Sequence, residues 1–85
     1  MAYRVLLRPA AARDLESLEP KIKARVEKAI SGLVVTPRPA GARKLVGFEN
    51  EWRLRVGTYR VLYVIDDPEK SLTVARIAHR REAYR

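Results

Sequence analysis

The stretch Trp52-Arg-Leu-Arg-Val-Gly-Thr-Tyr-Arg-Val-Leu-Tyr-Val-Ile-Asp66 decides the fold, because apolar residues alternate with arginines on both sides of a Gly-Thr pair. Alternation with a period of two is typical of half-buried strands, and a glycine-first pair between two such runs predicts a tight hairpin turn. If Gly57-Thr58 is that turn, the register follows by counting outward from it, and Arg55 lies opposite Arg60.

This register sorts the side chains of the hairpin onto two faces. Arg53, Arg55 and Arg60 share one face. Like charges directly opposite each other destabilise a sheet, whereas clustered guanidinium groups bind phosphate through paired hydrogen bonds. Exposed arginines can also be plain solubilising residues or can pair with nearby glutamates, so the pattern alone leaves both interpretations open. The other face carries the apolar set expected against a core: Trp52, Leu54, Val56, Tyr59, Val61 and Tyr63.

The remaining segments predict an α+β domain with the element order β-α-α-β-β-β-β. We expect two antiparallel helices to pack on one face of a small, mainly antiparallel sheet. The nearly all-apolar run 59–65 is expected to be the central strand, covered on both faces. The expected elements are a first strand at Ala2–Arg8, helices that begin near Pro9 and Pro20, a loop at Thr36–Gly41, a short strand at Lys44–Val46 and a last strand at Ser71–Ala78.

Length and composition set the limits on function. Eighty-five residues allow a single domain, 1–85, and 18 Lys+Arg against 10 Asp+Glu leave a net charge of +8, which favours an acidic partner such as nucleic acid. The chain has no cysteine, which excludes disulfides and thiolate metal sites, and its one histidine makes a histidine-rich metal site unexpected. The N-terminus lacks a signal-peptide pattern, and no apolar run is long enough to cross a membrane, so we expect a cytoplasmic protein.

The C-terminal residues add basic and aromatic side chains to the same region. If the last strand lies beside the central strand, its end brings His79, Arg80, Arg81 and Tyr84 towards Arg60. Each of these residues has an ordinary explanation when it is considered alone: the histidine ends a strand, the tyrosine packs on the core and the arginines are solvated. Taken together, they extend the arginine cluster.

The hairpin, followed by Ala78-His-Arg-Arg-Glu-Ala-Tyr84, resembles the RelE/ParE superfamily of bacterial and archaeal toxins, and its RelE branch in particular. The segments 11–15, 36–39 and 42–45 fit as well, so the resemblance covers nearly the whole chain. It implies a RelE-like fold of the microbial ribonuclease type and the toxin of a type II toxin–antitoxin system. It also implies a cognate RelB-like antitoxin as partner, and a ribosome-dependent endoribonuclease that cuts messenger RNA in the A site.

The resemblance also implies roles for individual residues in a metal-free, cofactor-free attack of the 2′-OH on the adjacent phosphate. Arg55 and Arg60 would clamp the phosphate, Arg80 would stabilise or protonate the leaving group, and either Tyr84 or His79 would be the general base. The best-known RelE pattern has lysines where this chain has Arg53 and Arg55. An arginine stays protonated and cannot accept a proton, so neither of these two residues is a candidate for the general base. The residues implied to bind RNA are Arg53, Arg81, Lys44, Arg43 and Arg85.

Two other functions remain open from the sequence. The first is a ParE-like toxin that inhibits DNA gyrase by binding, although ParE-like members generally lack the full basic cluster together with the terminal tyrosine. The second is a non-catalytic RNA- or ribosome-binding module, since phosphate contacts alone give affinity. Such modules commonly stack bases on exposed aromatic rings, whereas here the tryptophan and two tyrosines of the hairpin are expected on the core face.

Overall fold

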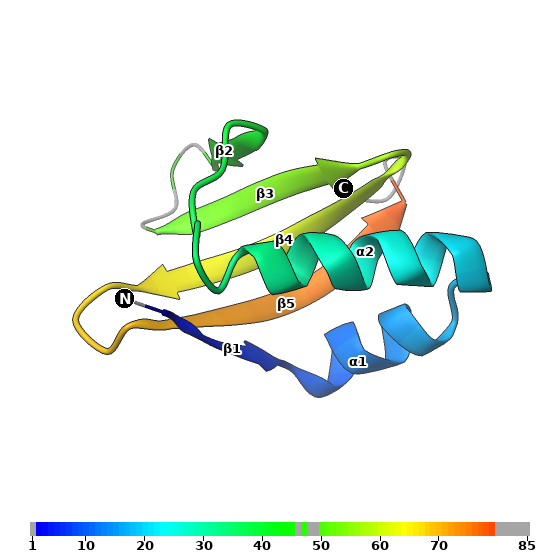
Figure 1. Cartoon of the computed structure of the whole chain (residues 1–85), viewed down its shortest axis with the longest axis horizontal. Helices are drawn as coiled ribbons and strands as arrows, with labels where there is room; N and C mark the ends of the chain where they lie inside the picture. The colour runs from blue at the N-terminus through cyan, green and yellow to red at the C-terminus, as the bar shows by residue number, and fades with distance from the viewer. Residues whose placement is uncertain (1, 46, 48–49, 80–85) are drawn as a thin grey trace.

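A computed structural model describes residues 2–45, 47 and 50–79, and in this part of the chain it contains two helices and five strands (Figure 1). The predicted element order is confirmed. The short strand expected at 44–46 is misplaced: it begins at Ala42 and ends at Lys44, because these residues pair with the next strand. The elements are β1 (Arg4–Leu7), α1 (Pro9–Glu16), α2 (Pro20–Gly32), β2 (Ala42–Lys44), β3 (Glu51–Val56), β4 (Tyr59–Asp66) and β5 (Ser71–His79).

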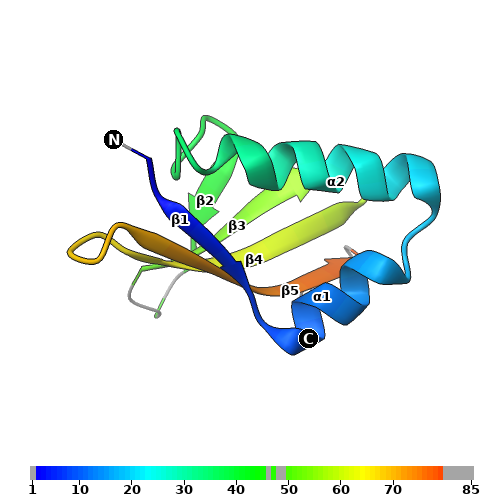
Figure 2. The ribbon, with the colours of Figure 1, turned by 60° about the horizontal axis from the view of Figure 1, so that its bottom comes forward.

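The strands form one mixed sheet in the order β1-β5-β4-β3-β2. Only β1 and β5 run parallel among the described strands, so the sheet is mainly antiparallel as predicted. Both helices lie on one face of the sheet and run in opposite directions (Figure 2). No helix in the described part of the chain is long and apolar enough to cross a membrane.

Both helices begin at a proline, which has the right backbone angle for a first helical turn and no N–H to leave unsatisfied there. Their apolar stripes face the sheet, where Ala11 and Val26 are fully buried. The core between the helices and the sheet also contains Leu15, Ile30, Leu33, Leu54, Val61, Tyr63, Ile65, Leu72, Val74 and Ile77.

The hairpin of β3 and β4 has the predicted register. Arg55 lies opposite Arg60, and Gly57 takes the first turn position with φ of 61°, a conformation that favours glycine. Strand β4 is the central strand of the five, but both described helices cover the same face of it. On its other face Leu62 and Val64 are half-buried rather than fully covered, so the expected cover on both faces is not seen in the described residues.

Two aspartates tie the layers together. Asp14 of α1 accepts hydrogen bonds from Arg76 Nε at 2.8 Å and from the backbone N–H of Ile77 at 2.9 Å, which joins α1 to β5. Asp67, in the β4–β5 turn, accepts from Arg38 Nη2 at 2.7 Å and from the Tyr3 hydroxyl at 2.5 Å. The contacts of Asp67 hold the loop that leads from α2 into β2, because Arg38 belongs to that loop.

Candidate nucleic-acid interface

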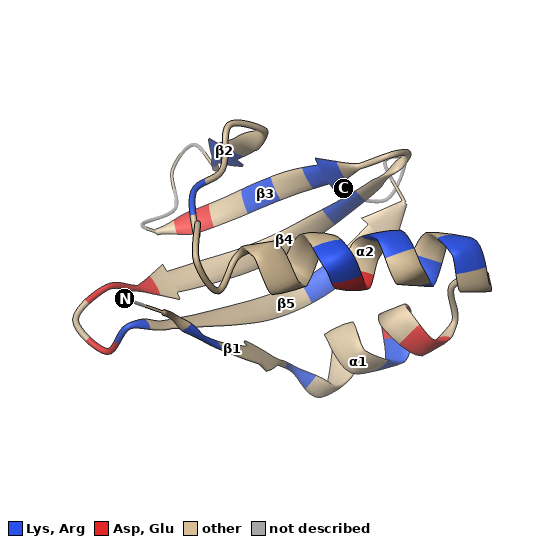
Figure 3. Cartoon of the chain, viewed as in Figure 1, with Lys and Arg blue, Asp and Glu red and all other residues tan. Residues whose placement is uncertain are grey.

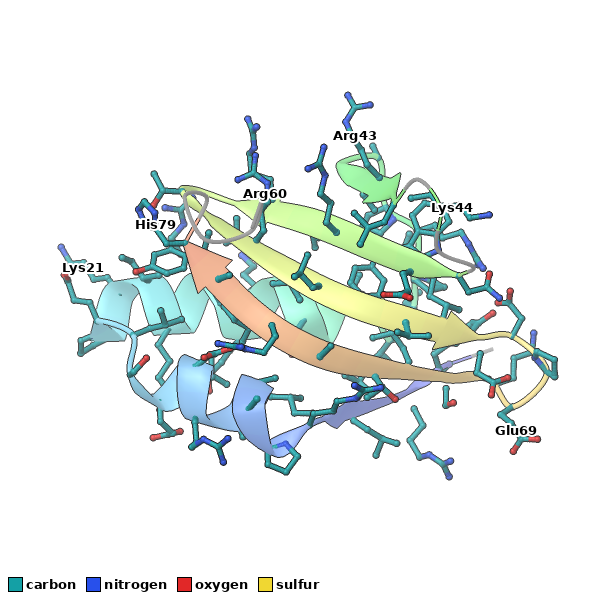
Figure 4. The ribbon with its side chains drawn as sticks, turned by 180° about the vertical axis from the view of Figure 1, so that it is seen from behind. Lys21, Arg43, Lys44, Arg60, Glu69 and His79 are labelled. Atoms are coloured by element: carbon teal, nitrogen blue, oxygen red, sulfur yellow. The ribbon has the colours of Figure 1, made fainter. Side chains whose placement is uncertain are left out.

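Four arginines from three neighbouring strands gather on the sheet face that points away from the helices. Arg43 of β2 lies opposite Arg53 of β3, and Arg55 of β3 lies opposite Arg60 of β4. With Gly41 they line a hollow of about 230 Å³, called here the arginine pocket. Figure 4 shows the labelled side chains of Arg43 and Arg60 rising from the same side of the sheet.

The members of the arginine pocket differ in burial. Arg60 is only 4 % exposed, Arg53 is half-buried, and Arg43 and Arg55 are exposed. A guanidinium held on the central strand of a sheet has few rotamers left, whereas the exposed pair can adapt to a ligand. The pocket therefore combines one buried guanidinium with one half-buried and two exposed guanidinium groups, which suits an anion with several oxygen atoms.

The pocket is electrostatically unusual for this chain. Two arginine pairs lie directly opposite each other, an arrangement that costs stability, and no carboxylate is among the described residues that line the hollow. The acidic residues of the described part of the chain lie instead at the β4–β5 turn, at the start of β3 and on or next to the helices (Figure 3). An anion with two or more charges would relieve the repulsion inside the pocket.

The structure places the other predicted site residues as follows. Lys44 lies opposite Trp52 and so shares its face of the sheet, away from the arginine pocket. His79 lies opposite Tyr59, and the two rings meet edge-on with their centroids 5.4 Å apart. The arginine-pocket face at the end of β5 carries Ala78 instead, opposite Arg60. Arg80, Arg81, Tyr84 and Arg85 lie outside the described residues.

The sequence did not reveal two features at the pocket: Gly41 in its lining and the contacts of Arg38 in the loop that leads to it. Gly41 lines it without a side chain, and a methyl group added there would make only an ordinary contact with Leu54. Arg38 holds the preceding loop: besides its ion pair with Asp67, its guanidinium lies 5.3 Å from the centre of the Trp52 ring. The Pro-Arg-Pro spacing of this loop was visible in the sequence, but its partners, more than ten residues away, were not.

One buried group beside this loop has a clearly perturbed ionisation. Burial raises the pKa of Tyr63 to about 12, and its hydroxyl donates a hydrogen bond to the carbonyl oxygen of Pro37 at 2.8 Å. The tyrosine therefore stays neutral and anchors the loop from the core side. Among the described residues, no group of three or more His, Cys, Asp or Glu side chains is gathered as a metal site.

Comparison with known proteins gives a consistent result. The model of the family described as "ParE toxin of type II toxin-antitoxin system, parDE" matches residues 5–84. The chain is 39 % identical to Toxin RelG of Mycobacterium tuberculosis over 89 residues, which cover 100 % of this chain and 99 % of that relative.

Similar solved structures come from the same class of toxin–antitoxin proteins as the sequence relative. The toxin–antitoxin complex RelBE2 from Mycobacterium tuberculosis contains a chain with a TM-score of 0.81 and 32 % identity, covering 93 % of this chain and 99 % of that one. The archaeal RelE–RelB complex from Pyrococcus horikoshii OT3 gives a TM-score of 0.85 at 26 % identity, covering 96 % and 99 % of the two chains.

Proposed function

The chain belongs to the RelE/ParE superfamily and is a RelE-like toxin of the type II toxin–antitoxin class, and on that premise we propose that it is a ribosome-dependent endoribonuclease that cleaves messenger RNA in the A site. The observation that carries the proposal is the arginine pocket, with its four guanidinium groups on one open sheet face. The ribosome and the messenger RNA are in the cytoplasm, where the toxin would inhibit translation.

The proposed reaction is an attack of a ribose 2′-OH on the adjacent phosphorus atom. The 2′-O–P bond forms as the base takes the hydroxyl proton, the P–O5′ bond breaks, and the leaving 5′-oxygen receives a proton. The products are a 2′,3′-cyclic phosphate and a 5′-OH end. Only RNA has the nucleophile, which restricts the substrate to RNA.

The arginines would act on the charge that grows on the phosphate oxygens during the attack. Arg55 and Arg60 would clamp these oxygens, while Arg43 and Arg53 would hold the neighbouring backbone. Fixed donors aimed at developing charge are most effective where water is excluded, and an open hollow on a sheet excludes little by itself. Docking in the A site would supply that exclusion, which explains the proposed dependence on the ribosome.

The general base is assigned to Tyr84 and the leaving-group role to Arg80. His79, the other candidate base, stands beside Tyr59 on the face opposite to the arginine pocket, so its ring would have to turn around the strand end to reach a bound phosphate. Arginines around a tyrosine favour its phenolate form, which is the form that accepts a proton.

A RelB-like antitoxin is the proposed partner. Three of the similar structures are complexes of a RelE chain with a RelB chain, and their alignments with this protein cover 92 to 96 % of its length. An acidic antitoxin segment placed over the arginine pocket would neutralise the same charges that bind RNA.

The deciding experiment is to map messenger RNA ends by primer extension on translating ribosomes with the purified toxin. Arg55→Ala tests the pocket, since its exposed side chain can be removed without disturbing the core. Arg13→Ala, which removes an exposed charge from α1, is the matched control. We expect codon-phased cuts with the unmodified toxin and with the control, cuts about 10²- to 10³-fold slower with Arg55→Ala, and none on free RNA.

Each other result changes the proposal in a defined way. If the folded toxin produces no cuts but blocks supercoiling by DNA gyrase, it acts as a ParE-like inhibitor by binding. If it binds ribosomes without cutting RNA and without affecting gyrase, it is a binding module. If Arg55→Ala cuts as well as the control, the arginine pocket is not the catalytic site.

A further inference from the structure

A second basic surface lies on helix α2. Lys21, Arg25 and Lys28 recur at helical spacing, share one flank of the helix and are all exposed. The opposite flank is electrically balanced: Lys23 forms an ion pair with Glu16 of α1 at 3.0 Å and also has Glu27 nearby. No acidic residue interrupts the first flank, so its three charges act in the same direction.

Arg25 connects this flank to the tip of the β3–β4 hairpin. Its Nη1 atom lies 3.4 Å from the point where a Cβ on Gly57 would stand, so the guanidinium packs directly over the turn. Ile22, Arg25 and the turn residues Val56–Tyr59 line a hollow of about 170 Å³. Its lining combines aliphatic side chains, a tyrosine and the arginine.

The hollow and the arginine pocket lie on the two sides of the same two-residue turn. Arg55 and Arg60 immediately flank that turn on the open sheet face, and Arg25 covers it from the helix side. The tip of the hairpin separates the two basic surfaces, and Figure 3 shows basic residues on α2 and near the ends of β3 and β4 that meet at the turn. A polyanion that leaves the arginine pocket past the tip therefore meets α2 next.

We infer that α2 carries a second RNA-contact segment: a single RNA strand runs from the arginine pocket around the hairpin tip and places its backbone on Lys21, Arg25 and Lys28. The hollow would take a base, since an aromatic ring and a guanidinium plane are the surfaces on which unstacked bases pack. This inference rests on the proposed function and extends its binding site from one phosphate to several nucleotides.

The test is RNA affinity, measured by fluorescence anisotropy with 2′-O-methyl oligonucleotides, which cannot be cleaved. A short probe of about 4 nucleotides fits the arginine pocket alone, and a long probe of about 12 nucleotides can reach α2 as well. The test variant is the triple substitution Lys21→Gln, Arg25→Gln and Lys28→Gln. The control variant removes three exposed charges from β1, from α1 and from the residue between them, namely Arg4→Gln, Arg13→Gln and Arg8→Gln.

We expect the test variant to bind the long probe more weakly and to lower the slope of log affinity against log salt by about 2, as the loss of three phosphate contacts to a single strand predicts. Its affinity for the short probe should match that of the control variant. Equal salt slopes for the test and control variants on the long probe would overturn the inference. So would an equal loss of the test variant's affinity for the short and the long probe.

The same titration separates this inference from the proposed function. If Arg55→Gln leaves binding of the short probe unchanged, the arginine pocket does not bind RNA and the proposed function fails at its first step. If Arg55→Gln weakens binding of the short probe but the α2 variant binds the long probe as its control does, the arginine pocket binds RNA. In that case only the proposed path of the strand around the hairpin tip is wrong.

Discussion

Arginines serve two different purposes in two regions of this molecule. Arg38 and Arg76 each hold one aspartate, at 2.7 and 2.8 Å, and so join elements that are distant in the sequence. The arginines of the arginine pocket instead lie opposite one another across β2, β3 and β4. The first arrangement joins elements of the fold, whereas the second places like charges together and costs stability, as expected of the proposed phosphate-binding site.

This contrast predicts that the two groups respond to mutation in opposite ways. Removing an exposed pocket arginine such as Arg55 relieves repulsion and removes a proposed phosphate ligand, so activity should fall while stability is kept. Removing a paired arginine or its aspartate should lower stability while the folded molecules keep their activity.

The largest effect is expected from Arg55→Ala. Losing one positioned donor to the transition state should lower the cleavage rate on ribosomes by about 10²- to 10³-fold. The free energy of unfolding should stay within about 0.5 kcal/mol of the unmodified value, because the side chain is exposed and lies opposite Arg60. Rates come from primer extension and stability from urea denaturation of the same preparations.

Arg76→Ala is the matched substitution in the other group. We expect it to lower the free energy of unfolding while the rate per folded molecule is unchanged, since it lies outside the arginine pocket. A variant of Arg76 that loses activity as steeply as Arg55→Ala would show that the division between the two groups does not hold.

The next effect concerns the aspartate that holds Arg76. Asp14→Ala should cost about 2–3 kcal/mol of unfolding free energy, because it removes charged hydrogen bonds and leaves the backbone N–H of Ile77 without its acceptor. Asp14→Asn keeps an acceptor for that N–H and should cost less. Urea titrations of the two variants check this order, and an equal loss would mean that the backbone contact contributes nothing.

The same aspartate predicts a dependence on pH. The hydrogen bond from Arg76, helped by the Ile77 N–H, lowers the pKa of Asp14 in the folded protein. A carboxyl group with a lowered folded-state pKa stabilises the fold above its unfolded pKa, about 4, and loses that contribution as the pH falls through the folded value. The stability difference between the unmodified protein and Asp14→Ala should therefore shrink below about pH 4.

The hairpin shows how much of the fold the sequence could predict. Counting outward from Gly57-Thr58 gives the observed register, because a two-residue turn leaves no freedom in the pairing of its strands. The pairing of Arg43 with Arg53 could not be counted in this way, since no tight turn connects β2 to β3. A three-residue edge strand also has too little alternation to mark its own ends, which is why β2 was misplaced.

The position of His79 depends on a local irregularity that the sequence does not reveal. A β-bulge between Leu62 and Tyr63 gives β5 one extra residue, so Arg60 lies opposite Ala78 and Tyr59 opposite His79. Without the bulge, the pairing of Tyr63 with Val74 would continue to Arg60 with Ile77, and His79 would share the arginine face. One inserted residue therefore decides which side of the sheet the imidazole occupies.

A smaller effect is expected for Tyr63→Phe. The hydroxyl is buried and donates to the Pro37 carbonyl oxygen at 2.8 Å, so its loss should cost about 1 kcal/mol at neutral pH. Because the folded-state pKa is raised to about 12, the neutral tyrosine stabilises the fold below pH 10 and that contribution is lost as the pH rises from 10 towards 12. The phenylalanine variant should lack this alkaline decline, which thermal unfolding at several pH values would detect.

The smallest effect is expected at the second aspartate, Asp67. The hydrogen bond from Arg38, followed by that from Tyr3, lowers the pKa of Asp67, but both side chains of the ion pair are more than a third exposed, at 36 % and 44 %. Exposed pairs contribute little and are screened by salt. Asp67→Asn should therefore lower the melting temperature less than Asp14→Asn does, and added salt should reduce the difference from the unmodified protein further.

Asp14 differs in being 18 % exposed and in accepting a backbone N–H. If both substitutions lowered the melting temperature equally and independently of salt, burial would not be what separates the two ion pairs, and the loop before β2 would be held as firmly as α1.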